Sequence, residues 1–264
     1  MIEDIKNISN TIFFAVISIV TILSYLQARK TLFAPIRTET FKMQLKAFEE
    51  VLQYFQNKSE SDLLDAFDLD RILRLNTLRM ADLYVDMFFP NEIKIDDAER
   101  DKTYSVLVGG IVSIEHAQKF FEKVEPTSNH KDKHPTDDKI SNPTIILAKW
   151  QKYEHEMIEY TKEFMDQIKE LDRMSASPIL PKQLRDHIID FRSIAHECLT
   201  TIGLTITEAS KKMPEHYPRS TDLITFSPTW IWNEFNESRE KFEPTAKKIL
   251  EHINSYLKVE DLMK

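Results

Sequence analysis

The pattern of hydrophobic and polar positions divides this chain into a short apolar beginning and a long amphipathic remainder. No residue from Asn7 to Ala28 carries a charge, and the stretch from Ile12 to Leu23 is apolar or hydroxyl-bearing on every helical face. A helix needs about 20 mostly apolar residues to cross the hydrocarbon layer of a bilayer. The run therefore predicts a transmembrane anchor in residues 1–30, with the lipid bilayer as its partner. The alternative, a buried core helix, would show a water-facing stripe that is missing here.

The flanks of the anchor predict its orientation. The leader before it carries no net positive charge and no small-residue cleavage site follows, so the run differs from a signal peptide. The basic residues Arg29, Lys30 and Arg37 follow it, and basic residues close to a span favour the cytoplasmic side. We therefore expect a single pass through the cell inner membrane, with Arg29, Lys30 and Arg37 at the membrane interface. The N-terminus would lie outside and residues 31–264 in the cytoplasm.

One stripe of the anchor is less apolar than the rest. Its members recur mostly at spacings of three and four residues and are Asn7, Thr11, Ser18, Thr21 and Tyr25. Small and hydroxyl side chains let membrane helices approach and hydrogen-bond, so the stripe predicts a homo-oligomer, of which a pore would be one form. The alternative is that the Ser and Thr hydroxyls bond back to their own helix.

The composition narrows the class of the remaining chain. The net charge of −8 argues against a nucleic-acid partner, and a lone cysteine among 264 residues excludes an internal disulfide framework and fits a reducing compartment. Three glycines cannot supply the glycine-rich loops of nucleotide-binding folds, and no cofactor is expected. Few glycines with many Lys, Glu, Leu and Ile are typical of an α-helical protein.

Proline positions and apolar spacing predict an all-α fold, with the transmembrane helix followed by a cytosolic bundle of about six helices. The expected helices are 38–56, 59–89 with Ser59 or Ser61 as cap, 96–124, 143–174, 181–212 and a last region that restarts at Pro244. Residues 125–143 keep no apolar period and predict a flexible loop. The segment 215–227 is expected to be irregular, and no strand pattern is found.

Two local patterns within these helices predict close packing. The first helix of the body carries a narrow apolar seam, which either extends a contact between copies or packs into its own bundle: Phe41, Leu45, Phe48, Leu52 and Phe55. Gly109 and Gly110 fall inside the third expected helix, where each costs about 1 kcal/mol relative to alanine. We expect them to allow close approach of another helix, a kink being the alternative.

Arg192 and His196 are the strongest candidates for chemistry. Four residues apart on the fifth expected helix, they project from one face. This local arrangement resembles helical ribonucleases of the HEPN type, in which an arginine steadies a phosphate and a histidine moves a proton. The spacer here is shorter than in that pattern, and the likeness covers five residues. The favoured alternative is a surface salt bridge with Glu197 or another acid.

Other candidates are weaker. His130 and His134, with neighbouring aspartates, offer metal ligands, but they fall in the expected loop beside Pro135, so a solvated loop is favoured and no metal is predicted. The acidic residues around His155 lack the Glu-x-x-His pattern of di-iron bundles on two helices and are interpreted as exposed helix charges. Cys198 lies on an apolar seam and is interpreted as a small core residue.

Trp230 and Trp232 form the densest aromatic patch with their neighbours. Two residues apart, they point to different faces of a helix, so one of them is expected at an interface with a protein partner. The alternative is a helix buried on two sides.

Two classes of function fit these observations. The first is a single-pass, self-associating helical protein that acts as a non-enzymatic scaffold or as a membrane-perturbing effector. Its layout, a short anchor before a cytosolic helical body, is similar to that of bacterial antiviral membrane effectors, by architecture alone. The second is a membrane-tethered HEPN-like ribonuclease that uses Arg192 and His196. The first is preferred because no catalytic motif is found.

Overall fold

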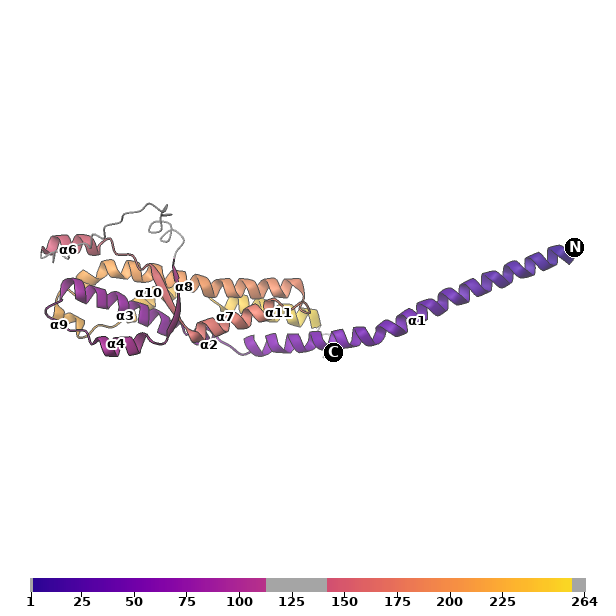
Figure 1. Ribbon diagram of the computed structural model, residues 1–264, viewed down its shortest axis with the longest axis horizontal. Coiled ribbons are helices and arrows are strands. Elements are labelled where there is room, and N and C mark those ends of the chain that lie inside the picture. The colour runs from indigo at the N-terminus through magenta and orange to yellow at the C-terminus, as the bar shows by residue number, and fades with distance from the viewer. Residues whose placement is uncertain (1, 113–141, 258–264) are drawn as a thin grey trace, which may run out of the picture.

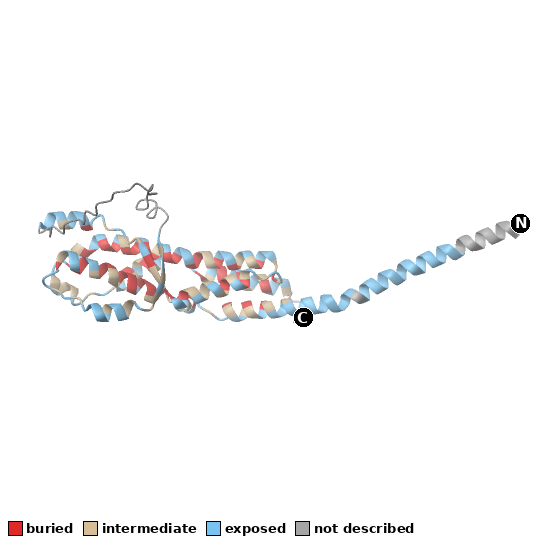
Figure 2. Cartoon of the chain, in the orientation of Figure 1, coloured by how far each residue is buried: buried red, intermediate tan, exposed pale blue. Residues whose placement is uncertain are grey.

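The computed structural model describes residues 2–112 and 142–257, apart from the side chains of residues 2–12 and 32. Its longest element is α1 (Ile2–Phe55), an unbroken helix that contains Pro35 and spans about 80 Å at 1.5 Å per residue. Most of α1 projects away from the body, and only its last turns pack against other helices (Figures 1 and 2). The expected separate helix starting at residue 38 is therefore wrong, because a proline can bend a helix without ending it.

The body is a helical bundle, as the all-α prediction states. Its helices are α2 (Glu60–Ala66), α3 (Leu69–Phe88), α4 (Asp97–Tyr104), α6 (Pro143–Trp150), α7 (Lys162–Ser175), α8 (Lys182–His216), α9 (Ser220–Leu223), α10 (Thr229–Ser238) and α11 (Glu243–Leu257). The central helix, α8, runs along nearly the whole body (Figure 1). It contacts α3, α7, α10 and α11, so most of the core forms around it.

Aromatic side chains fill the part of the core where α1, α2, α8 and α11 meet. The ring of Phe67 stacks on Phe242 at 5.1 Å between centroids, and Phe191 packs against Phe55 at 4.9 Å. All four rings are almost fully buried. Burying a phenylalanine stabilises a fold by about 1.5–3 kcal/mol, so this cluster anchors the end of α1 in the bundle.

The expected helix over 59–89 begins as predicted and then divides. Ser59 caps α2 in a capping box with Asp62, whose side chain accepts hydrogen bonds from the Ser59 backbone N–H and hydroxyl. Asp68 then adopts a left-handed conformation with φ of 53°, which ends α2 and starts α3 in a new direction. Aspartate is one of the few residues that tolerate this conformation, so the break is local in origin.

The absence of strands predicted from the sequence is wrong. Strand β1 (Leu107–Val112) pairs antiparallel with β2 (Met157–Thr161), in register from Gly109 opposite Tyr160 to Val112 opposite Met157. The expected helix 96–124 thus stops at Tyr104, with residues 113–124 outside the described part. The expected helix 143–174 is interrupted after Trp150 by β2 and resumes as α7.

The paired glycines serve this small sheet, not a helix–helix contact. A Cβ on Gly109 would lie 2.6 Å from the Tyr160 hydroxyl, and one on Gly110 would lie 3.1 Å from Cγ of Met157. The close approach expected at these glycines is therefore made by a strand. Short apolar runs of this kind fit a strand or a helix equally well by period, and the pairing partner decides between them.

The C-terminal third follows the prediction more closely. Helix α8 continues through Pro214 to His216, beyond the expected end at Lys212, and the segment expected to be irregular holds the short α9. Helix α11 begins one residue before Pro244, where the restart is predicted. The expected flexible loop, 125–143, lies almost entirely outside the described residues.

Candidate functional site

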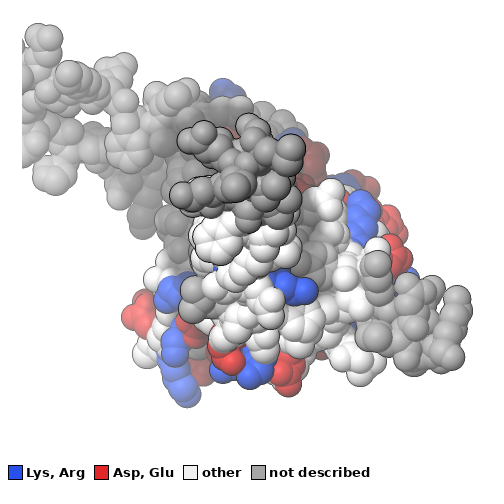
Figure 3. Space-filling view, turned by 90° about the vertical axis from the view of Figure 1, so that its right-hand side faces the viewer, with Lys and Arg blue, Asp and Glu red and all other residues white. Residues whose placement is uncertain are grey.

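The projecting part of α1 is the most distinctive surface of the molecule. By length and composition it is able to span a membrane, and none of its apolar stretch is buried against the body. Phe13, Ile19 and Leu23 are each more than half exposed. Seen from the end at which α1 projects, uncharged side chains occupy most of the middle of the face and charged ones lie mainly toward its edges (Figure 3). Exposed apolar surfaces of this extent mark contacts with a membrane or with another protein.

The predicted oligomerisation stripe lies along this exposed helix. Ser18, Thr21 and Tyr25 are exposed, whereas the side chains of Asn7 and Thr11 lie outside the description. Thr21 Oγ1 donates a hydrogen bond to the carbonyl of Ile17 at 2.8 Å, the back-bonding that the alternative expects. This bond satisfies the hydroxyl hydrogen but leaves the oxygen able to accept from a neighbouring helix.

The basic residues predicted at the membrane interface follow the apolar stretch on α1. Arg29, Lys30 and Arg37 are all exposed on the projecting part. No residue before Phe48 is buried in the described part of α1, so a stalk lies between the anchor and the body, which we define as residues 31–43. Lys42 of the stalk pairs with Glu39, one turn away.

The apolar seam of the first body helix divides at the point where α1 enters the bundle. Phe48 and Phe55 are buried in the core, and Leu52 is partly buried against it. Phe41 and Leu45 remain exposed, at 53% and 39%. The C-terminal half of the seam thus packs into its own bundle, and the N-terminal half stays without cover in the described residues.

Arg192 and His196 lie on α8 beside α7. The Arg192 guanidinium forms an ion pair with the carboxylate of Asp172, which joins the two helices. The His196 ring meets Phe164 edge to face at 6.0 Å, and burial, followed by the charge of Arg192, lowers its pKa. The Asp172 carboxylate engages Nη1 of Arg192, so a phosphate at that nitrogen would compete with it. The ion pair is of the kind that the salt-bridge alternative describes, with Asp172 as the acid instead of Glu197.

The two tryptophans of α10 have different surroundings, and both are half-buried. The Trp230 ring stacks on His216 at 4.7 Å, nearly parallel to it, and its buried Nε1 has no hydrogen-bond partner in the described part. Trp232 packs against Phe235 and lines a hollow of about 140 Å³ beside Arg74 of α3. The predicted role of this pair in binding a partner stays a prediction.

Cys198 lies in the core, as its position on an apolar seam suggests. It is 1% exposed, and burial raises the pKa of its thiol to about 12, so it is an inert thiol at neutral pH. Nearby, Arg239 is 4% exposed and forms an ion pair with Glu60 of α2. Glu60 also accepts the backbone N–H of Glu243 at 2.8 Å, so one carboxylate connects α2 to the start of α11.

A buried amide that the sequence analysis missed connects α3 to β2 of the two-stranded sheet. The side chain of Asn76, fully buried, donates from Nδ2 to the Glu159 carbonyl at 2.8 Å and accepts the Glu159 N–H at 3.0 Å. Its Oδ1 also lies 3.2 Å from Nε2 of His155, whose Nδ1 meets the Tyr153 hydroxyl at 2.8 Å. Burial, with a smaller effect from Arg79, lowers the His155 pKa to about 4. His155 is therefore a neutral structural group.

Glu159 extends this connection to a second layer of charges. It forms an ion pair with Arg79 of α3, whose guanidinium lies over the Tyr104 ring at 4.2 Å. The Tyr104 hydroxyl donates to Asp82 at 2.5 Å, and Arg100 pairs with the same carboxylate at 2.8 Å. The interpretation of Glu154, Glu156 and Glu159 as exposed helix charges is thus wrong. Glu154 and Glu156 lie in the irregular segment before β2, and Glu159 lies in the strand and is paired.

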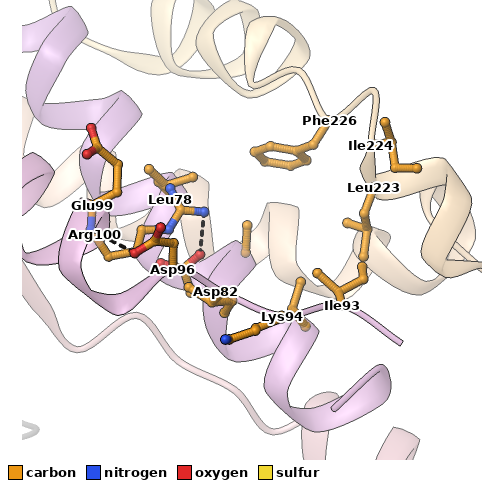
Figure 4. Close-up of a pocket in the computed structure, with 13 residues that line it drawn as sticks. Leu78, Asp82, Ile93, Lys94, Asp96, Glu99, Arg100, Leu223, Ile224 and Phe226 are labelled. Carbon is orange, nitrogen blue, oxygen red and sulfur yellow. Dashed lines mark hydrogen bonds and ion pairs between the residues drawn. The ribbon is translucent and has the colours of Figure 1, made fainter. Parts of the chain in front are cut away.

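Next to the Asp82 pair, the surface opens into a cavity of about 340 Å³ (Figure 4). It lies between α3, α4 and α9, at the end of the body away from the projecting part of α1 (Figure 1). Its lining is mainly apolar and includes Leu78, Val85, Ile93, Leu223, Ile224 and Phe226. Figure 4 places Phe226 and Ile224 across the opening from the charged Arg100.

The chemistry of this cavity suits a small apolar group. Its volume is near the lower end of small-ligand sites, which span about 300–1,000 Å³. Burial raises the pKa of Asp82, but its two oxygens are engaged by Tyr104 and Arg100, so it is a structural carboxylate in this geometry. Ile224, at 82% exposure, extends the apolar surface at its edge.

The remaining metal candidates, His130 and His134, lie outside the described residues. Comparison of the chain with known proteins finds no matching family model, curated relative or solved structure. The functional inference therefore depends on the geometry above.

Proposed function

We propose that this chain is a single-pass membrane protein that self-associates through its N-terminal helix and acts as a non-enzymatic scaffold. The observation that carries the proposal is the continuity of α1, whose apolar part is fully exposed while its last turns are fixed in the aromatic core. Pro35 bends α1 without ending it, so a continuous helix joins the apolar stretch to the body. The alternative within this class is an effector whose assembled anchors perturb the membrane. A role in antiviral defence is suggested by the layout of the chain alone.

Several features support a scaffold over an enzyme. Arg192 is engaged by Asp172, Cys198 is buried with a raised pKa, and His155 is neutral and hydrogen-bonded. The cavity beside α3 is lined mainly by aliphatic side chains and fits an apolar side chain of a protein partner. In our proposal the body stands off the membrane on α1 and presents this cavity at its far end.

We propose the inner membrane as the location, with the N-terminus outside and the body in the cytoplasm. The exposed Arg29, Lys30 and Arg37 after the apolar stretch favour this orientation. Proteolysis of right-side-out vesicles tests it: the body should be protected until the vesicles are opened. Digestion of the body in closed vesicles would show that the topology is the reverse of the one proposed.

Self-association is tested by the mass of the detergent-solubilised protein. Ser18→Leu with Thr21→Leu should lower the assembled mass, while the protein stays in the membrane fraction. Val16→Leu with Val20→Leu is the matched control, because it adds apolar volume to the opposite face of the same turns. A wild-type monomer at micromolar concentration, or equal masses for both double variants, would contradict the proposed stripe.

A further inference from the structure

We infer that the contact between copies continues out of the membrane along one face of the stalk, through Ile36 and Met43. This inference rests on the proposed self-association and names where the second copy lies. Ile36 and Met43 are 59% and 56% exposed, large apolar side chains that no described part of the body covers. Both precede Phe48, the first buried residue in the described part of α1.

The unbroken helix determines which face of the stalk is involved. Eighteen positions separate Ser18 from Ile36, and the same number separates Tyr25 from Met43. At 3.6 residues per turn, eighteen residues make five full turns, so each pair lies on one line along α1. Pro35 removes one backbone hydrogen bond but leaves α1 a single helix. The stripe within the membrane therefore shares a face with Ile36 and Met43. The same count places Glu39, which pairs with Lys42, in line with Thr21, so this face of the stalk carries two apolar positions and one charged position.

A second copy is the occupant that this geometry favours. Chains anchored in one bilayer by the same helix have the same direction and the same depth, so equivalent residues of two copies meet at equal height. Ile36 would then meet Ile36, and Met43 would meet Met43, in a parallel pair of helices. The body does not block this face, because α1 turns Phe48, Val51 and Phe55 toward the bundle and Met43 lies to one side of them.

The area of the stalk contact explains its dependence on the membrane stripe. Two side chains per copy bury far less than the roughly 1,200 Å² at the lower limit of stable protein interfaces. The stalk contact alone would therefore not hold two bodies together. Joined to the stripe in the anchor, it extends an interface that already exists and fixes the relative rotation of the two bodies.

Disulfide cross-linking of the full-length protein in native membranes tests this geometry. Ile36→Cys and Met43→Cys should each give a covalent dimer on mild oxidation. Thr38→Cys and Leu45→Cys are the matched controls, since each lies two residues further along α1 and so points to nearly the opposite face. The wild-type chain is the blank, because its lone Cys198 is buried.

We expect a dimer yield at Ile36→Cys and Met43→Cys at least fivefold above that of the two controls. Adding Ser18→Leu and Thr21→Leu to Met43→Cys should reduce this yield to the control level. Equal or higher yields at Thr38→Cys and Leu45→Cys, in a protein that still assembles, would overturn the stalk face and leave the proposed function intact. If the wild-type protein is a monomer and none of the cysteine variants cross-links, both the stalk contact and the proposed self-association are wrong. An undiminished yield in the triple variant would also overturn the inference, because the stalk contact would then be independent of the anchor.

Discussion

Nε2 of His155 lies 3.2 Å from Oδ1 of Asn76, although 79 positions separate the two residues in the chain. The contact determines the tautomer of the neutral ring. Its Nε2–H donates to Asn76, and its Nδ1 accepts from the hydroxyl of Tyr153. A proton added at Nδ1 would face the Tyr153 hydroxyl hydrogen and would charge a buried ring near Arg79. Burial, and to a smaller extent the charge of Arg79, therefore favours the neutral form of His155 in the connection between α3 and the β1–β2 sheet.

The first prediction is a loss of stability in acid that His155 causes. Its pKa in the folded protein is about 4, below the ordinary value of 6.5. The unfolded chain thus takes up a proton that the folded chain excludes, so this stability is complete above pH 6.5 and falls as the pH drops from 6.5 toward 4. The contribution at stake is about 3 kcal/mol. Thermal unfolding of the detergent-solubilised protein, followed by circular dichroism between pH 4 and 8, measures it.

The control for this pH dependence is His155→Gln, which keeps a donor toward Asn76 and does not titrate. The difference in melting temperature between wild type and variant should shrink, or change sign, as the pH falls through this window. A constant difference from pH 4 to pH 8 would show that His155 does not cause the acid loss.

The second prediction concerns the amide partner of His155. Asn76→Ala removes the hydrogen bonds to both backbone groups of Glu159 and leaves them buried, at a cost of about 2–4 kcal/mol. Asn233→Ala on the exposed face of α10 is the matched control and should change stability by less than about 0.5 kcal/mol. Chemical denaturation of both variants in the same detergent compares them. Similar denaturation midpoints for Asn76→Ala and Asn233→Ala would mean that other contacts hold β2 against α3.

The third prediction uses a close contact between α8 and β2. A Cβ on Gly203 would lie 2.7 Å from Cδ1 of Ile158, so Gly203→Ala should destabilise the protein by about 1–3 kcal/mol despite the better helix propensity of alanine. Ile158→Val removes Cδ1 but keeps a γ-carbon where Cγ1 lies 3.0 Å away, so in that background Gly203→Ala should cost less than it does in the wild type. Unfolding free energies of the four proteins of this double-mutant cycle test the coupling. Additive effects would contradict the contact.

The helices were more predictable from the sequence than the contacts between them. Helix α8 shows its apolar face over many turns, and the Ser59 capping box is a local signal, so both were found. The two-stranded sheet was missed because its strands are only six and five residues long and neither shows a strand pattern without the other. A pairing between segments so far apart leaves no period in either of them.

The candidate site divides in the same way. The anchor was readable because an uncharged run is a property of one segment. The Asn76 connection could not be predicted in this way, since its partners His155 and Glu159 lie about 80 positions further along the chain. A signal was present nevertheless: Asn76 interrupts the apolar face that Ile72 and Met80 define on α3. A buried amide on such a face needs partners, and this points to a tertiary hydrogen bond.

The fourth prediction is that the body folds without its anchor. The described contacts of α1 with the body begin at Gln44, which donates to the Ile179 carbonyl, and the first buried side chain is Phe48. Removing residues 1–30 should therefore leave the bundle intact. Removing residues 1–40 should leave it intact as well, and it also takes away the exposed apolar side chains of Phe33 and Ile36. Both truncated chains should be helical by circular dichroism, the shorter one being the more soluble. Loss of the helical signal would show that the anchor is part of the folding unit.

The last prediction separates the scaffold from the ribonuclease. Arg192→Ala with His196→Ala breaks the ion pair to Asp172, which is partly exposed, so we expect a stability loss of about 1 kcal/mol or less and unchanged membrane fractionation and assembled mass. Arg173→Ala is the matched control, because Arg173 is an exposed arginine that joins α7 to α1 through Glu50. RNA incubated with wild type, double variant and control should show the same background cleavage in all three. Cleavage by wild type and by Arg173→Ala that disappears in the double variant, with the melting temperature retained, would establish Arg192 and His196 as catalytic residues. The preference for a non-enzymatic scaffold would then be wrong.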